Sequence, residues 1–271
     1  MATLKSINKK VEKRQDGTLE EVDRFIKNLK KFLDKGLEEI VGELEDGNID
    51  PALYLGGLLE QLKKRGLRKQ MGELQAIYGK ELKRVQGSFT QDGYNKSLAY
   101  IGKETLTQLI TFKVEDIENK SLDVIGSLRP IMLEQVITGQ KIDIEPLKDK
   151  ISGRLFGNIK TELNTAMLNF SRTISASKYI EEGTTKFLYA GPLDDITRPF
   201  CEEVLTERDP AIYTLDEILS MDNGQIGDVM TSCGGYNCRH QWAPVSDSLE
   251  KQLNGEEEDL DAQLAELELD E

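Results

Sequence analysis

The feature that most constrains the fold of this chain is a long run of apolar residues at helical spacing near its start. Between Leu19 and Leu44, apolar side chains recur every three or four positions. They are Val22, Phe25, Ile26, Leu29, Phe32, Leu33, Leu37, Ile40, Val41 and Leu44. This spacing places them on one stripe of an α-helix, which must be buried against other elements. The sequence therefore predicts a long amphipathic helix that ends near Asp46, where Gly and Asn follow.

The same helical period continues to about residue 180. A second helix is expected to begin at Pro51, behind Asp50 as its N-cap. Pro130 lies inside an apolar segment and should kink or interrupt the helix there. The clearest later helix opens near Asp143 and carries a stripe that ends at Ile174. We expect residues 1–180 to form one helical region.

The character of the sequence changes after residue 181. From Lys186 onward, turn-forming pairs follow one another at a density that long helices cannot accommodate. These pairs are Gly191-Pro192, Arg198-Pro199, Asp209-Pro210, Asn223-Gly224 and Gly234-Gly235. We expect a compact, turn-rich α+β unit at 181–246, with a strand at 186–189 and a short helix near 215–221. The predicted fold class is mainly α: a long-helix N-terminal region, this small unit and an acidic tail at 247–271.

Charge is unevenly distributed along the chain. It has 35 Lys and Arg against 49 Asp and Glu, a formal net charge of −14, so general attraction to DNA phosphate is not expected. Eleven acidic residues and one basic residue lie in 246–271, a tail that is expected to be solvated and mobile. The basic start of the chain could contact DNA phosphates or could simply be solvated. Its basic residues are Lys5, Lys9, Lys10, Lys13 and Arg14. Because no run of about 18 apolar residues occurs, we expect neither membrane insertion nor export.

The three cysteines and the only histidine of the chain lie in the small unit. They are Cys201, Cys233, Cys238 and His240. Three thiols and one imidazole are a valid tetrahedral set for structural zinc. Cys238 and His240 are separated by one residue, however, where zinc sites usually have two to four, and Cys201 is not part of a CxxC pair. Buried cysteines beside a hydrogen-bonded histidine are an equal alternative, and a disulfide is a lesser one.

The same residues allow an enzymatic interpretation. Cys201 or Cys238 could be a nucleophile activated by His240, with a third group that orients the imidazole ring. Asp194 or Asp195 could be that group, although Asp in a loop more commonly caps a turn. The sequence contains none of the GxGxxG, P-loop, HExxH or GxSxG patterns. We therefore predict that the chain is not an enzyme.

Two separated segments carry a family resemblance. FLYAGPLDDITRPFC at 187–201 and CGGYNCRHQWAPV at 233–245 resemble the C-terminal signature of the Mu F-like minor head proteins of tailed phages. The Thr161-Glu162 step and the helix that follows it are similar to the segment that leads into this signature. The likeness covers about residues 155–246, whereas residues 1–150 match only in being helical.

The resemblance implies a structural protein of the virion. Such a protein is made in the host cytoplasm, associates with portal and capsid proteins, and acts in head assembly and in DNA packaging or ejection. Carried over by position, the signature residues are Asp195, Thr197, Arg198, Cys201, Cys238, Arg239, His240 and Pro244. Pro199 and His240 stand where some members of the family carry cysteine, which weakens the zinc prediction more than the family resemblance.

Overall fold

The computed structural model describes residues 4–46, 50–91, 94, 96–98 and 101–254. The chain is mainly α-helical and divides into two compact units. Gly17–Leu168 form a helical unit, and Met1–Asp16 together with Asn169–Glu271 form a smaller unit that contains the only sheet among the described residues. The mainly α fold class predicted from the sequence is confirmed.

The predicted long helix is α1, Leu4–Glu45, which follows the apolar stripe to its end. Val22, Ile26 and Leu29 are fully buried, and the rest of the stripe is buried apart from half-buried Phe32. The expected turn residues Gly47 and Asn48 lie outside the described part of the chain.

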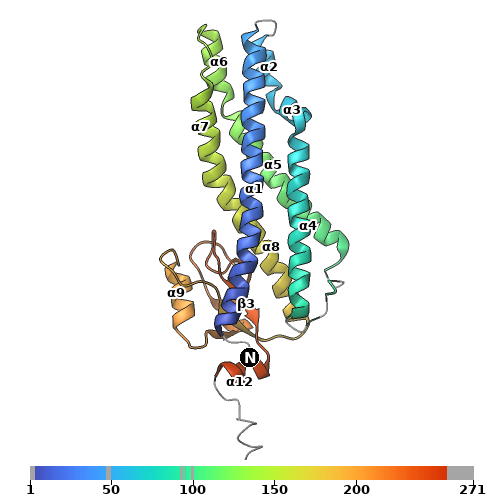
Figure 1. Ribbon diagram of the computed structural model, residues 1–271, viewed down its shortest axis with the longest axis vertical. Helices are drawn as coiled ribbons and strands as arrows, with labels where there is room; N and C mark the ends of the chain where they lie inside the picture. Colours follow the sequence, from blue (N-terminus) through green and yellow to red (C-terminus); the bar gives the residue numbers. More distant parts are fainter. Residues whose placement is uncertain (1–3, 47–49, 92–93, 95, 99–100, 255–271) are drawn as a thin grey trace, which may run out of the picture. The chain divides into compact units, whose positions relative to one another are not determined.

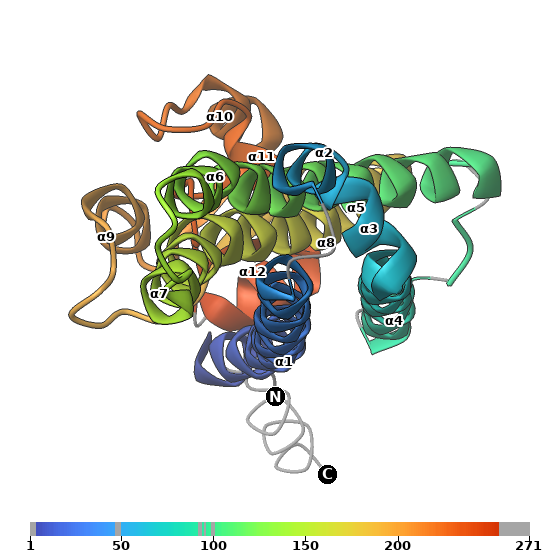
Figure 2. The ribbon, with the colours of Figure 1, turned by 90° about the horizontal axis from the view of Figure 1, so that it is seen from above.

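The next helices also begin where the sequence predicts. Asp50 caps α2 by accepting hydrogen bonds from the backbone N–H groups of Ala52 and Leu53. These helices are α2 (Pro51–Gly56), α3 (Leu58–Leu62), the π-helical turn η1 (Lys63–Leu67) and α4 (Arg68–Gln91). Within the helical unit, α4 runs beside α1 (Figures 1 and 2).

Three further helices and one π-helical turn lead to α8. They are α5 (Lys103–Gly126), α6 (Arg129–Ile137), α7 (Ile144–Arg154) and η2 (Leu155–Ile159), followed by α8 (Lys160–Glu181). Pro130 stands in the first turn of α6, so it separates α6 from α5 as expected. The stripe that ends at Ile174 is buried along its whole length. In the helical unit α5 crosses α1 and α4 obliquely (Figure 1).

A buried polar network fixes α1 against α4. Thr18 donates a hydrogen bond of 2.7 Å to the Glu81 carboxylate, and Arg84 donates one of 2.8 Å to the Thr18 hydroxyl. Arg84 also forms an ion pair with Glu81, whose side chain is only 2% exposed. Because a buried carboxylate is costly unless it is paired, this network favours a single register of the two helices.

The smaller unit is built on a three-stranded antiparallel sheet of order β2-β1-β3. The strands are β1 (Lys186–Ala190), β2 (Ile212–Thr214) and β3 (Gln241–Pro244). Short helices connect and follow them: α9 (Pro199–Thr206), α10 (Leu215–Ser220), α11 (Val229–Ser232) and α12 (Asp247–Leu253). The predicted first strand and the predicted helix near 215–221 correspond to β1 and α10. Residues 255–271, most of the acidic tail, lie outside the described part.

The compact units follow a different division from the one expected at residue 181. The smaller unit also takes in the start of α1 and the second half of α8. Asn8 accepts a hydrogen bond from the backbone N–H of Gly191, and Arg14 donates one to the Gln241 side chain. Arg172 on α8 donates to the backbone carbonyl of Cys238. These side-chain contacts explain why parts of two long helices belong to the turn-rich unit.

A membrane-spanning helix is not found among the described residues, since no helix there is both long enough and apolar enough.

Candidate metal centre

The sheet of the smaller unit brings distant parts of the sequence to one point. In the register of β1 and β3, Ala190 faces Gln241, so the residue after β1 and the residue before β3 lie side by side. That residue before β3 is His240. Cys201 comes from the first half of α9, and Cys238 from the turn that follows α11. The fold therefore gathers side chains that are up to 39 positions apart in the sequence.

Cys201, Cys238 and His240 form a buried cluster that could hold a metal ion. Their donor atoms all lie within 4.8 Å of one another. The two sulfurs are 3.7 Å apart, and the Cys238 Sγ is 3.6 Å from the His240 Nδ1. Around one tetrahedral zinc, two sulfurs would lie about 3.8 Å apart, and a sulfur and a ring nitrogen about 3.6 Å apart. These two distances are close to the values that a zinc ion requires, and the third donor pair lies within 4.8 Å.

The tautomer of His240 suits metal binding. Its Nε2 lies 2.8 Å from the backbone carbonyl oxygen of Pro192. A carbonyl oxygen can only accept, so Nε2 carries the proton, and in the neutral ring Nδ1 keeps a free lone pair directed toward Cys238. Metal-binding histidines commonly donate their second N–H to a backbone carbonyl in this way. Tyr189 stacks on the ring, with centroids 5.2 Å apart and planes at 9°, and holds it in place.

Cys238 is the cysteine whose surroundings most favour the thiolate form. Hydrogen bonds from Cys201 and Cys233 lower its pKa well below the usual range, and the charge of Arg172 acts in the same direction. Its sulfur also accepts backbone hydrogen bonds from Gly234 at 3.1 Å and from its neighbour His240 at 3.5 Å. Hydrogen bonds to the charged form stabilise that form, as they do in thiolate metal sites.

Cys201 differs from Cys238 in its preferred protonation state. Its hydrogen bond with Cys238, together with burial, raises the pKa of the Cys201 thiol. The Tyr189 hydroxyl donates to its sulfur at 3.3 Å, and burial raises the pKa of that hydroxyl. Of these two neighbouring thiols, Cys238 is therefore the one that loses its proton more readily. A divalent cation would instead make the second thiolate favourable.

Cys233, the fourth ligand expected from the sequence, lies outside the group of three. It is completely buried, and burial raises the pKa of its thiol. Its backbone has a φ of 50° and a ψ of −118°, which is unusual for a residue other than glycine. All three cysteines are free, so the disulfide alternative is not observed.

Two glycines leave room for the cluster, although the sequence indicates them only as members of turn-forming pairs. A Cβ atom at Gly234 would lie 2.2 Å from the Cys201 sulfur and 3.2 Å from the Cys238 sulfur. A Cβ atom at Gly191 would lie 2.5 Å from the His240 Cδ2. Both contacts are far closer than real Cβ atoms show, so each position requires glycine. The signal available in the sequence was the glycine directly after Cys233.

The predicted signature residues occupy the loop and the turn around this cluster. Arg198 donates a hydrogen bond of 2.6 Å to the Gly234 carbonyl, and the Thr197 hydroxyl donates to the Pro192 carbonyl. Arg239 forms an ion pair of 2.5 Å with Asp194. That contact lowers the pKa of the Asp194 carboxyl to about 2.

Asp194 caps the turn that precedes α9, since it accepts hydrogen bonds from Thr197 and from the backbone of Ile196. Asp195 is exposed, and no hydrogen bond or ion pair is found for it within the described residues. Pro244 lies at the end of β3, opposite Phe187. The turn-capping alternative therefore describes Asp194, and neither carboxylate orients the imidazole.

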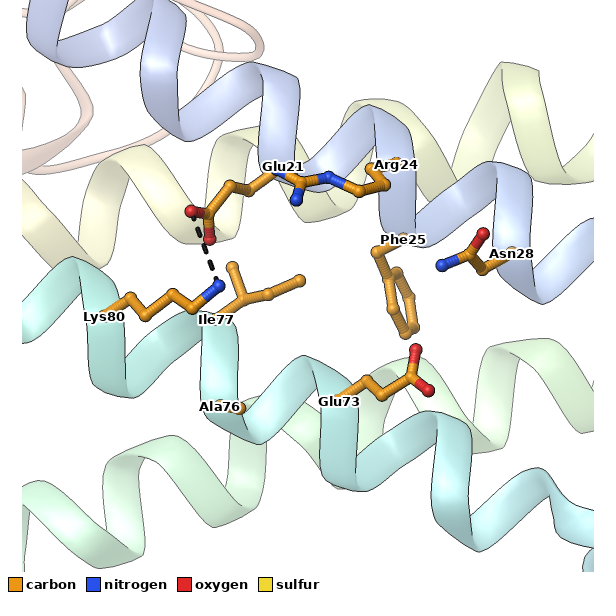
Figure 3. A pocket seen from close by; sticks show the side chains of 8 residues that line it. All are labelled: Glu21, Arg24, Phe25, Asn28, Glu73, Ala76, Ile77 and Lys80. Atoms are coloured by element: carbon orange, nitrogen blue, oxygen red, sulfur yellow. Dashed lines mark ion pairs between the residues drawn. The ribbon is translucent and has the colours of Figure 1, made fainter.

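A separate hollow lies in the helical unit, between α1 and α4. Figure 3 shows Phe25 pointing toward α4, beside Asn28 and Glu73, while Glu21 and Lys80 form an ion pair of 3.7 Å at one end. The volume is about 200 Å³. The lining contains neither cysteine nor histidine. We interpret it as a packing gap between two helices.

Comparison of the chain with protein-family models, curated proteins and solved structures finds no match.

Proposed function

We propose that this protein is a minor head protein of a tailed phage, made in the host cytoplasm and built into the virion near the portal. What supports the proposal is the convergence of the two signature segments, which the sequence separates by 31 residues, on one cluster. Cys201 of the first segment lies against Cys238 of the second. Arg198 and Arg239 add contacts between the same two segments, to Gly234 and Asp194.

Zinc is the metal that we propose for the cluster. Two cysteine sulfurs and one imidazole nitrogen are ligands that zinc favours, whereas calcium and magnesium require oxygen. The smaller unit has a sheet of only three short strands and many turns, so a metal would supply the stability that a larger core supplies elsewhere. In this role zinc would fix α9 and the turn after α11 to the end of the sheet. It would not take part in any reaction.

The proposed action is mechanical. The long helices of the helical unit offer contact area for portal or capsid subunits. The smaller unit, stabilised by its metal, offers a rigid surface for recognition. Pre-organised surfaces bind with less loss of conformational freedom. The lysines at the start of α1 are exposed, so contact with packaged DNA through phosphates remains part of the proposal.

A cysteine-dependent enzyme is the second candidate, because the Cys238 sulfur lies 3.6 Å from the His240 ring. Burial argues against it, since the side chains of Cys201, Cys238 and His240 are no more than 4% exposed and a nucleophile must meet its substrate. Replacing His240 by Ala separates the candidates. Loss of zinc and of assembly supports the structural role, whereas loss of a turnover activity supports the enzyme.

Fractionation of infected cells tests the main proposal. The chain should copurify with portal protein and be present in finished particles, at low copy number. The Cys238→Ser variant should fail to enter particles, whereas Lys83→Ala on the exposed side of α4 should enter normally. A chain that stays free in infected cells and is absent from particles would overturn the proposal.

A further inference from the structure

A groove in the smaller unit lies between the start of α1 and the loops that follow β1 and α9. Its volume is about 600 Å³, within the range of roughly 300–1,000 Å³ typical of ligand pockets. The apolar part of its lining includes Leu4, Tyr189, Leu193, Leu205 and Ala211. Leu193 is 60% exposed, so its apolar surface is accessible from solvent. The groove is thus a pre-formed apolar surface.

The α1 wall of the groove carries two lysines and one glutamate. Lys5 and Lys9 line it one helical turn apart on α1, and both are exposed. Within the described residues no ion pair is found for either lysine. Glu12 and Asp209 are the acidic members of the lining, whereas Arg208 is already paired with Glu217 at 2.7 Å. An apolar floor beside two free ammonium groups suits an acidic peptide that carries apolar side chains.

The chain itself contains such a peptide, and that segment begins close to the groove. Asn254, the last described residue, lines an adjacent hollow that shares Arg208 and Asp209 with the groove. The segment 255–271 that follows has nine acidic residues and no basic one. It carries leucines at 260, 264, 267 and 269. Ten residues of extended chain span up to about 35 Å, so Leu264 is within reach of the groove.

We propose that the segment 255–271 binds in this groove of the same chain. Its leucines would lie against the apolar lining, and its carboxylates would lie beside Lys5 and Lys9. Because the segment is tethered at Asn254, its effective concentration is on the order of millimolar, so even weak intrinsic contacts would keep the groove occupied. The proposal concerns only this groove and does not depend on the phage assignment.

Hydrogen exchange followed by mass spectrometry on the full chain tests this inference. The test variant is Lys5→Glu with Lys9→Glu. The matched control is Lys10→Glu with Lys13→Glu, which makes the same charge change at exposed positions of the same helix that do not line the groove. In the unmodified chain and in the control, amides of 260–269 should exchange about tenfold more slowly than in the test variant. High salt should speed exchange in the unmodified chain because it screens the lysines.

Three results would overturn the proposal. The first is exchange of 260–269 at the rate of an unstructured peptide in the unmodified chain. The second is an equal loss of protection in the control, which would mean that charge acts without the groove. The third is protection that increases with protein concentration, which would assign the groove to the segment of a second copy.

Discussion

Gly234→Ala is the substitution that most sharply tests the geometry of the proposed metal centre. The new Cβ would lie 2.2 Å from the Cys201 sulfur, and ordinary contact begins at 3.4 Å, so the sulfur would have to retreat by about 1.2 Å. Ligand distances in a metal site tolerate changes of only about 0.2 Å. The substitution leaves all three proposed ligands chemically intact and moves one of them out of place.

Gly234→Ala should lower both the stability of the chain and its affinity for zinc. Overpacking a buried site costs about 1–3 kcal/mol, which corresponds to roughly 4–8 °C in Tm for each kcal/mol in a unit of about a hundred residues. Zinc affinity should fall on the order of 100-fold, as it does when the support of a ligand is lost. Calorimetry of the zinc-loaded and chelator-treated chain separates the two effects, because only the second depends on the metal.

Gly227→Ala is the matched control, since a Cβ atom there meets nothing within 4 Å. It should bind zinc as the unmodified chain does and should unfold within a degree or two of it. If Gly234→Ala matched this control in zinc affinity and in Tm, the close packing of the cluster would be refuted.

Three further predictions follow from individual contacts. Asp194→Asn should remove the part of the acid sensitivity of folding that lies between about pH 4 and pH 2. Arg239 lowers the pKa of Asp194 to about 2, so the charged carboxylate stabilises the fold above its ordinary pKa, and this stability is lost as the pH falls to about 2. Acid titration of unfolding checks this prediction. Arg172→Met should destabilise the chain by about 2–4 kcal/mol in urea unfolding because it leaves buried carbonyls without a donor; a change below 0.5 kcal/mol would show that water replaces the guanidinium. Arg84→Met should cost about 1–3 kcal/mol, and adding Glu81→Gln should recover part of that loss, whereas strict additivity of the two changes would mean that the pair is not coupled.

The sequence predicts the helices well because their signals are local. Helical periodicity, the N-caps Asp50 and Asp143 and the interruption at Pro130 depend on residues close to one another in the chain. The same signals do not say what a buried stripe packs against. For this reason the sequence predicts the start of α1 as part of the helical region, whereas Asn8 and Arg14 form hydrogen bonds with Gly191 and Gln241 of the smaller unit.

The candidate site was predictable in composition but not in detail. Cysteine and histidine content identified Cys201, Cys238 and His240, because few other side chains bind metals through sulfur and nitrogen. Cys233 is expected as the fourth donor because the chain has three thiols. The number of thiols does not show where each side chain points. Tyr189 and Arg172 support the cluster by a ring stack and by a hydrogen bond to a carbonyl, and neither contact has a signature in the sequence.

Metal analysis of the purified full-length chain tests the central claim most directly. Elemental analysis should find one zinc per chain, and the Cys238→Ser variant, purified in parallel, should contain none. Cobalt substitution should give thiolate-to-metal charge-transfer absorption in the unmodified chain only. A chain that is folded and free of metal after exposure to zinc, or a Cys238→Ser variant that retains its zinc, would contradict the assignment of Cys201, Cys238 and His240 as a metal centre.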